Sequence, residues 1–328
     1  MNLICDCCGK VTPPELLHRD SRYQICDACY RKSYTRCAAC QSMIHIEDVY
    51  HTRGQSYCIS CYSDLFQSIH PHDYKPSPVF YGATPRFFGV ELEIDDGGHS
   101  DENARILLET VNTDTEYIYI KTDQSLRDGL EIVTHPMTLD FHLHRFDWAK
   151  LMKTAEQLGY HADDADTCGL HIHVNRNALG ENYEEQEKVI ERILFFVELH
   201  WNELFIFSRR SQHSMNRWAA RYGMEKTGKE ILDKAKKGNT GRYAAVNLCN
   251  YSTIEFRLFR GTLKVNTLYA TLQFVNRIID TALTLSEDEI AAQSWSDFVA
   301  AVTEPELIRY LKERRIYINE EVKAEEDM

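Results

Sequence analysis

Apolar and ionisable residues alternate in a short segment near residue 90. In RFFGVELEID, Glu91 and Glu93 stand between the apolar residues Val90, Leu92 and Ile94. Because successive side chains of a strand point to opposite faces, this alternation predicts a strand with one apolar and one acidic face. A solvent-facing antiparallel sheet would explain the polar face without special chemistry, so the other segments decide between the two interpretations.

Three further segments have the same alternation. In GLHIHVN, His171 and His173 stand between apolar residues. Glu255 and Arg257 do so in TIEFRLF, and Glu131 does so in GLEIVTHP. Taken singly, a histidine on a strand is more often structural, and a Glu-x-Arg pair is usually a surface ion pair that contributes little. In one shared sheet, however, these strands would gather acids, imidazoles and a guanidinium on one face, a set that binds divalent cations and an anion.

Helical periodicity predicts the elements between the strands. We expect one helix after a Ser100 N-cap, one over residues 139–158 and a long one over residues 183–207. Residues 208–245 are basic and interrupted by glycines, which favours an irregular segment with a mobile loop, and two or three helices end the chain. Strands interspersed with helices indicate an α+β or α/β fold, and their order alone does not fix the sheet topology.

The composition is typical of a globular protein. The chain has 328 residues, 43% of them hydrophobic and 27% charged, which suffices for one large domain or two smaller ones. No run of about 18 apolar residues occurs, so no membrane span is expected. The sequence does not open on a basic and then apolar leader, and we expect a cytoplasmic protein. The net charge of −13 argues against nucleic-acid binding through a general positive field.

The cysteines are concentrated near the start of the chain. Eight of the eleven form four C-x2-C pairs, and a shift of 32 residues maps the first two pairs onto the last two. Two such pairs supply the four soft ligands that zinc takes in a tetrahedron, whereas redox-active pairs are the alternative interpretation. The internal repeat therefore predicts two structural zinc sites, one with Cys5, Cys8, Cys26 and Cys29, the other with Cys37, Cys40, Cys58 and Cys61.

The predicted zinc module covers residues 1–69. A segment at 70–85 holds four of the eight prolines and is predicted to be an extended linker to a catalytic domain at 86–328. The module resembles LIM-type treble clefs, although its all-cysteine ligands depart from the LIM pattern. Its seven Lys/Arg are balanced by seven Asp/Glu, so it lacks the basic stripe of a nucleic-acid reader. Protein docking or structural support is the expected role.

Four motifs resemble, in order, those of the amidoligases, which are carboxylate–amine ligases of the glutamine synthetase-like superfamily. They are GVELEI, KTDQSL followed by GLEIVTHP, CGLHIHVN, and VNL followed by TIEFRLFRGTL, and they span about residues 86–280. The resemblance implies an α+β domain with a curled, mostly antiparallel sheet of glutamine synthetase-like type and outer helices. Its concave face would hold ATP and two or more Mg²⁺ or Mn²⁺ ions.

The resemblance also implies roles for individual residues. Arg257 matches the arginine that meets phosphate, and His173 would face the nucleotide or the substrate. Further nucleotide contacts are expected from Arg242, Asn175 and Arg260. The metal ligands of the family match Glu91, Glu93, Glu131, His171 and Glu255.

These expectations predict an ATP-dependent ligase that joins a carboxylate to an amine through an acyl phosphate. The acid and the amine would be small molecules or groups of a peptide or protein. One alternative is a metal-dependent hydrolase that uses His171 and His173, for which the sequence offers no obvious third ligand nearby. The other is a zinc-finger interaction protein with an inactive ligase-like domain.

Overall fold

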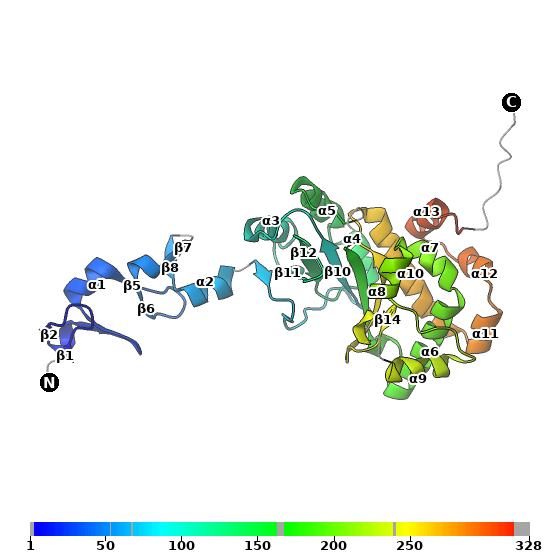
Figure 1. Cartoon of the computed structure of the whole chain (residues 1–328), viewed down its shortest axis with the longest axis horizontal. Helices are drawn as coiled ribbons and strands as arrows, with labels where there is room; N and C mark the ends of the chain where they lie inside the picture. Colours follow the sequence, from blue (N-terminus) through cyan, green and yellow to red (C-terminus); the bar gives the residue numbers. More distant parts are fainter. Residues whose placement is uncertain (1–2, 53, 67, 163–166, 239–240, 318–328) are drawn as a thin grey trace, which may run out of the picture. The chain divides into compact units, whose positions relative to one another are not determined.

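The computed structural model describes residues 3–52, 54–66, 68–162, 167–238 and 241–317 (Figure 1). The chain forms two compact units, Met1–Gln67 and Ser68–Met328. None of the helices in the described residues combines the length and low polarity required to cross a bilayer.

The first unit is a structural as well as a sequence repeat. Each half has two short antiparallel hairpins, and the second cysteine pair of each half opens a helix, as the sequence predicts. The first half contains β1 (Leu3–Ile4), β2 (Val11–Thr12), η1 (Pro14–Leu16), β3 (Leu17–Arg19), β4 (Gln24–Cys26) and α1 (Asp27–Ser33). The second contains β5 (Tyr34–Arg36), β6 (Met43–His45), η2 (Ile46–Asp48), β7 (Tyr50–Thr52), β8 (Gln55–Tyr57) and α2 (Ile59–Phe66).

The hydrophobic clusters of this unit are small. One contains Ile25 and Met43 with buried cysteines, and the other contains Ile44 and Tyr57 with Cys37. Clusters of this size cannot offset the conformational entropy of the folded unit by themselves. Metal ligation is therefore expected to supply most of its stability.

One seven-stranded open sheet organises the second unit. Its order is β14-β15-β13-β10-β12-β11-β9, and all neighbours are antiparallel except β9 and β11. With the helices around it, the unit has the predicted α+β class, and the four strands singled out from the sequence are consecutive neighbours. The strands are β9 (Ile69–His70), β10 (Phe88–Ile94), β11 (Ile118–Lys121), β12 (Leu130–Thr134), β13 (Gly169–Asn175), β14 (Val246–Asn247) and β15 (Thr253–Arg260).

The segment 70–85, predicted as a linker, is packed on the second unit. β9 extends the sheet at its edge, and the backbone N–H of Tyr81 donates to Pro136 O at 3.0 Å. The Tyr81 hydroxyl donates to Glu116 O at 2.9 Å. The backbone of this proline-rich segment is extended, and these hydrogen bonds hold it against the second unit. Several prolines favour an extended conformation, but they do not show that a segment lacks contacts.

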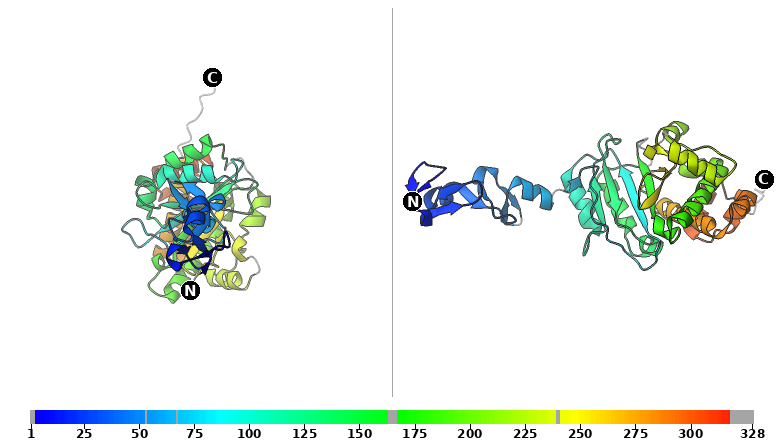
Figure 2. Two further views of the ribbon diagram at one scale, coloured as in Figure 1. Left: turned by 90° about the vertical axis from the view of Figure 1, so that its left-hand side faces the viewer. Right: turned by 90° about the horizontal axis from the view of Figure 1, so that it is seen from below.

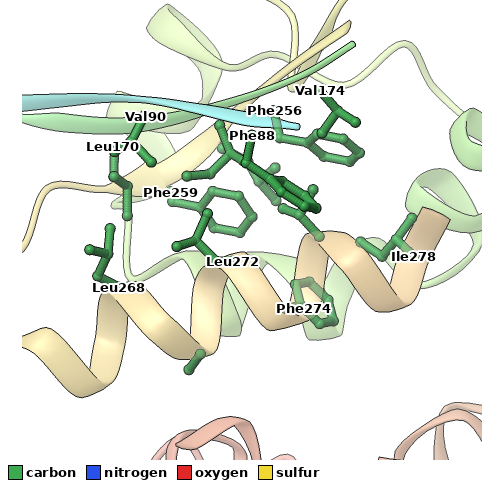
Figure 3. Close-up of a cluster of buried hydrophobic side chains, with 14 of the residues drawn as sticks. Phe88, Val90, Leu170, Val174, Phe256, Phe259, Leu268, Leu272, Phe274 and Ile278 are labelled. Carbon is green, nitrogen blue, oxygen red and sulfur yellow. The ribbon is translucent and has the colours of Figure 1, made fainter. Parts of the chain in front are cut away.

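Helices cover the apolar face of the sheet. α10 (Val265–Thr284) packs Leu268, Leu272 and Ile278 against apolar side chains of β10, β13 and β15, whereas Phe274 lies on the other side of the helix and stacks on Phe207 (Figure 3). On the strands, these side chains alternate with the ionisable residues, so the ionisable side chains project from the opposite face. α3 (Asp101–Val111), for which Ser100 Oγ accepts the N–H of Asn103 at 3.3 Å, packs beside β11.

Two predicted helices are each divided in two. Residues 139–158 form α4 (Leu139–His144) and α5 (Trp148–Gln157), and Asp147 caps α5 by accepting the N–H of Lys150 at 2.9 Å. Residues 183–207 form α6 (Tyr183–Leu199) and α7 (Trp201–Ser208), which are separated at His200. The apolar period runs across both breaks because the pieces on either side bury residues in the same core.

The segment 208–245, predicted to be irregular, contains two helices. α8 (Gln212–Trp218) and α9 (Gly228–Lys237) begin at Ser211 and Thr227, whose side chains accept backbone N–H groups. η3 (Arg176–Ala178) precedes α6, which lies beside α9, and η4 (Gly241–Tyr243) follows α9 (Figure 1). Residues 239–240 of the predicted mobile loop lie outside the described residues.

After α10, the described chain ends with α11 (Glu287–Ala292), α12 (Trp295–Ala300) and α13 (Pro305–Glu313), drawn in orange to red in Figure 2.

Shortening Leu272 to Ala is expected to destabilise the second unit by about 2–5 kcal/mol, because Leu272 is fully buried between α10 and the sheet. Leu283→Ala on the same helix is the matched control, since Leu283 is 36% exposed. Urea unfolding followed by tryptophan fluorescence measures the difference, because all four tryptophans (residues 148, 201, 218 and 295) belong to this unit. Equal losses in both variants would show that α10 does not form the core.

His142 is expected to make stability depend on pH. It is fully buried, and Nδ1 accepts the Trp148 Nε1–H at 3.3 Å, so Nε2 carries the proton given to Phe88 O at 3.0 Å. Burial lowers the pKa of His142 from 6.5 to about 4. Between these values the unfolded chain binds more protons, so stability rises with pH, and lowering the pH from about 7 to about 5 should remove about 2 kcal/mol.

The measurement is the unfolding free energy of the wild type and His142→Gln at both pH values. The variant should lack this part of the pH dependence. An unchanged slope would contradict the assignment of a neutral buried imidazole.

Candidate functional site

The ionisable residues of the central strands lie opposite one another on the polar face of the sheet. Glu91 of β10 is opposite His171 of β13, and Glu93 is opposite Glu131 of β12. His173 of β13 is opposite Glu255 of β15. Directly opposed residues share a face and have neighbouring Cβ atoms, so the sheet register itself assembles the group.

The side chains of this group approach within contact distance. His171 Nδ1 lies 3.2 Å from Glu91 Oε2 and 3.6 Å from Glu255 Oε1. His173 Nε2 lies 3.3 Å from Glu91 Oε1 and 3.8 Å from Glu255 Oε1. Thr253 Oγ1 lies 3.1 Å from His173 Nδ1 and fixes the orientation of that ring.

Two sets of potential metal ligands share Glu91. Glu91, His173 and Glu255 offer ligand atoms within 4.8 Å of one another, and Glu91, Glu131 and His171 offer a second such set. Carboxylate oxygens with an imidazole suit Mg²⁺ or Mn²⁺ and also accept zinc. One carboxylate common to both sets is the arrangement that would hold two cations side by side.

Glu93 lies outside both sets. Its Oε2 accepts the backbone N–H of Gly169, and its Oε1 lies 3.7 Å from His171 Nε2. The predicted ligand therefore lies on the side of the imidazole away from Glu91, where it can orient the His171 ring toward a metal.

Burial and mutual charge set the protonation of the group. Burial, together with the charge of Glu91, raises the pKa of Glu131 well above its usual value, against the opposing charge of Lys121 at 3.0 Å. Burial also opposes ionisation of Glu91, but the charges and hydrogen bonds of His173 and His171 hold its pKa well below the usual value. Burial likewise opposes charge on His173, and Glu91 and Glu255 still raise its pKa. The raised pKa values of His173 and Glu131 favour protons in this acidic group, and bound cations would reduce the same negative charge, which fits the donor set to metal ions.

These residues line a cavity of 480 Å³ that also contains cationic and aromatic side chains. Arg257, which pairs with Glu255, lines the cavity, and Arg242 reaches it from η4. The sequence analysis missed several of its lining residues: His72, Lys75, Lys121, Asp123, Arg210, Trp218, Tyr243, Asn247 and Asn250. A volume of this size accommodates a nucleotide-sized ligand.

Two predicted nucleotide contacts are not among the cavity-lining residues. Asn175 Oδ1 accepts the N–H of Phe87 at 2.8 Å and its Nδ2 donates to Pro85 O at 3.0 Å, so its amide fixes the start of β10. Arg260 lies opposite Gly169, beyond a register irregularity between β13 and β15, and Gly169 shares its face of β13 with His171 and His173, so Arg260 is on the polar face. The nucleotide contacts expected of Asn175 and Arg260 therefore stay predictions.

The sequence pattern could have predicted some of the missed cavity-lining residues. Lys121 ends the strand YIYIK and lies opposite Glu131, so the alternation of that strand could have placed it on the polar face. Asn247 lies opposite Glu255 and donates to its Oε2 at 2.6 Å, but its strand has only two residues. Arg210, between α7 and α8, follows no local pattern.

The cysteine sets of the first unit fit zinc. Cys8 Sγ and Cys26 Sγ are 3.8 Å apart, and Cys40 Sγ and Cys58 Sγ are 3.9 Å apart. Ligands at about 2.3 Å in a zinc tetrahedron lie about 3.8 Å from one another. In each predicted set, the four Sγ atoms lie within 4.8 Å of one another.

Backbone donors favour thiolates in these sets. Burial opposes ionisation of Cys37, but backbone N–H groups of Cys40 and Cys58 lower the pKa of its thiol to about 6. Cys5 in the first set has the corresponding donors and a pKa also lowered to about 6. Cys5 and Cys37 can therefore supply the thiolate, which is the metal-binding form, whereas hydrogen bonds with Cys26 and Cys58 raise the pKa of Cys29 and of Cys61.

Comparison with known proteins does not place the chain in a family. No family model matches it, and no curated protein matches it. A solved bifunctional glutathione synthetase from Pasteurella multocida is similar, with 13% identity and a TM-score of 0.36. The similarity covers 70% of this chain and 46% of the other, so this chain spans about half of that protein. We infer function from the cavity and the sequence motifs.

Proposed function

We propose that this protein is an ATP-dependent carboxylate–amine ligase of the amidoligase type, with a glutamine synthetase-like catalytic sheet. The observation that supports the proposal is the pair of ligand sets that share Glu91, in a cavity that also holds Arg257 and Arg242. A triphosphate carries several negative charges, and adjacent cations with nearby guanidinium groups are what bind and neutralise it.

The chain itself would position the reactants. Arg257 Nε is buried without a hydrogen-bond partner, which leaves it ready to donate to a phosphate oxygen. Magnesium or manganese ions, when bound, would neutralise phosphate charge, and the residues that would hold them are Glu91, Glu131, His171, His173 and Glu255. Their fixed positions on four paired strands would keep the phosphate chain aligned with the acid substrate.

The reaction has two steps in this proposal. An oxygen of the acid substrate attacks the terminal phosphorus, and the bond from that phosphorus to the ADP oxygen breaks. The amine then attacks the carbonyl carbon of the acyl phosphate, phosphate leaves, and the new amide releases one proton. Activation is required because a free carboxylate is a poor electrophile, and the protein contributes alignment and charge neutralisation to the transfer.

One observation favours a second candidate. The sequence offered no third ligand for a hydrolase built on the two histidines, but Glu91 and Glu255 complete a three-ligand set with His173. Such a set with an open position is typical of metal-dependent hydrolases. A hydrolase would act without nucleotide, which separates the two candidates.

The test combines calorimetry and turnover. The ligase predicts ATP binding that depends on Mg²⁺ or Mn²⁺, and phosphate release that depends on a matched acid and amine in a substrate screen. Absence of nucleotide binding with either metal would contradict the ligase. Amide or ester cleavage in nucleotide-free buffer would establish the hydrolase.

We also propose that the zinc module docks a peptide or protein that carries one of the reacting groups. Its balanced charge and its exposed apolar residues, such as Ile46 and Ile59, suit a protein surface better than nucleic acid. Deletion of residues 1–67 should weaken turnover of a peptide substrate while a small amine substrate is used as before. Equal use of both by the full chain and the deletion variant would contradict docking.

A further inference from the structure

Arg210 is a buried arginine of the cavity that belongs to none of the sequence motifs. It is 6% exposed, and it follows Arg209, whose positive φ of 62° turns the chain between α7 and α8. It lines the cavity together with Glu93, His171 and Arg257. A guanidinium is rarely buried without a specific reason.

The hydrogen bonds of Arg210 are made to neutral acceptors. Nη1 donates to Ser214 Oγ at 3.0 Å, and Nη2 donates to the backbone oxygen of Arg257 at 3.3 Å. Nε is buried without a partner. Both acceptors are neutral. The carboxylate of Glu93 is near enough to act on the guanidinium, but its Oε2 accepts the backbone N–H of Gly169, and in the described residues it forms no ion pair with Arg210 within 4.0 Å.

The neighbouring backbone is shaped to admit this side chain. A Cβ atom at Gly169 would lie 2.7 Å from Arg210 Nη2 and 2.6 Å from His171 Nε2, so only glycine leaves room for both groups. The bond to Arg257 O is made where the register of β13 and β15 is irregular, at Leu170 and Ile172. Arg210 is therefore held beside His171, which belongs to one of the two ligand sets.

A buried cation that no carboxylate contacts is costly, and part of the cost is recovered when an anion binds to it. Glu93 favours the charged guanidinium, whereas Arg257 and Arg260 add positive charge around it and increase the attraction for an anion. Arginine presents its donors in a fork that matches the oxygens of a carboxylate or a phosphate.

We propose that Arg210 binds an oxyanion of the reactants, either the carboxylate of the acid substrate or the phosphoryl group transferred to it. This assignment rests on the proposed function for the identity of the reactants. It makes Arg210 a substrate-binding residue on the His171 side of the cavity.

The test uses the full chain in buffer without nucleotide or divalent metal, with orthophosphate and succinate as separate probes. Calorimetry should show binding of at least one probe to the wild type. Arg210→Met should weaken that binding about 10-fold or more, because a charge-assisted hydrogen bond is lost. Arg210→Lys should keep part of the affinity, and Arg105→Met, which changes a 53% exposed side chain on α3, should keep all of it.

The probe that loses affinity identifies the group. Loss for orthophosphate alone assigns Arg210 to the phosphoryl group, and loss for succinate assigns it to the carboxylate. No binding of either probe to the wild type, or equal binding by Arg210→Met, would overturn the proposal. ATP binding is measured separately, so a failed ligase assignment and a failed Arg210 assignment give different results.

NMR of the wild type is a second measurement, to be used if Arg210→Met does not fold. The arginine Nε–H resonance that is present in the wild type and absent from Arg210→Lys should shift when the bound probe saturates the protein. A resonance that does not move overturns the proposal without reference to Arg210→Met.

Discussion

Replacing Glu91 with Gln is expected to lower ATP turnover by about 100-fold or more, because both ligand sets lose the carboxylate they share. Gln keeps the size of the side chain, so the sheet should remain folded. It cannot carry the negative charge, and each cation would then be held by two residues of its set. The expected loss is larger than for Glu255→Gln, which removes a ligand from one set only.

The measurement is phosphate release with saturating Mg²⁺, together with calorimetry for ATP. Glu109→Gln is the matched control, because Glu109 is exposed on α3 and pairs only with Arg105 in the part of the chain described here. A folded Glu91→Gln variant with the turnover of the control would show that Glu91 holds no catalytic cation.

Removal of one zinc ligand should unfold one half of the zinc module. Cys37 is fully buried, and Cys37→Ala leaves its set with three ligands. Zinc contributes about 10–16 kcal/mol to folding in comparable small modules, which exceeds what the cluster of Ile44 and Tyr57 can supply. We expect two zinc ions per wild-type chain and one per variant chain by elemental analysis.

Cys7→Ala is the matched control, because Cys7 is exposed and outside both sets. It should retain two ions and resist protease as the wild type does. Tryptophan fluorescence should stay unchanged in Cys37→Ala, since the tryptophans belong to the second unit. A Cys37→Ala chain that keeps two ions, or a wild type that binds none, would contradict the zinc assignment.

Local patterns were enough to predict the strands and the direction of their side chains. Alternation in β10, β13 and β15 reports which residues share a face, because the period of a strand is two. It does not report which strands are neighbours, since pairing depends on contacts between distant segments. The site could be anticipated only because four strands with the same anomaly suggested a shared sheet.

Sequence patterns are not enough where distant contacts decide the local structure. Asn175 continues the alternation of β13, but its amide is used by backbone groups of residues 85 and 87. Arg210 enters the cavity from a turn between helices, so no period in the sequence could reveal it. The breaks at Asp147 and His200 interrupt helices whose apolar pattern continues, because the same core receives both pieces.

Anomalous diffraction from crystals of the full chain with Mn²⁺ and a non-hydrolysable ATP analogue tests the central claim most directly. The account predicts two manganese peaks in the cavity, both in contact with Glu91, one beside His173 and Glu255 and the other beside Glu131 and His171. A map without manganese in this cavity, or with manganese that does not contact Glu91, would contradict it.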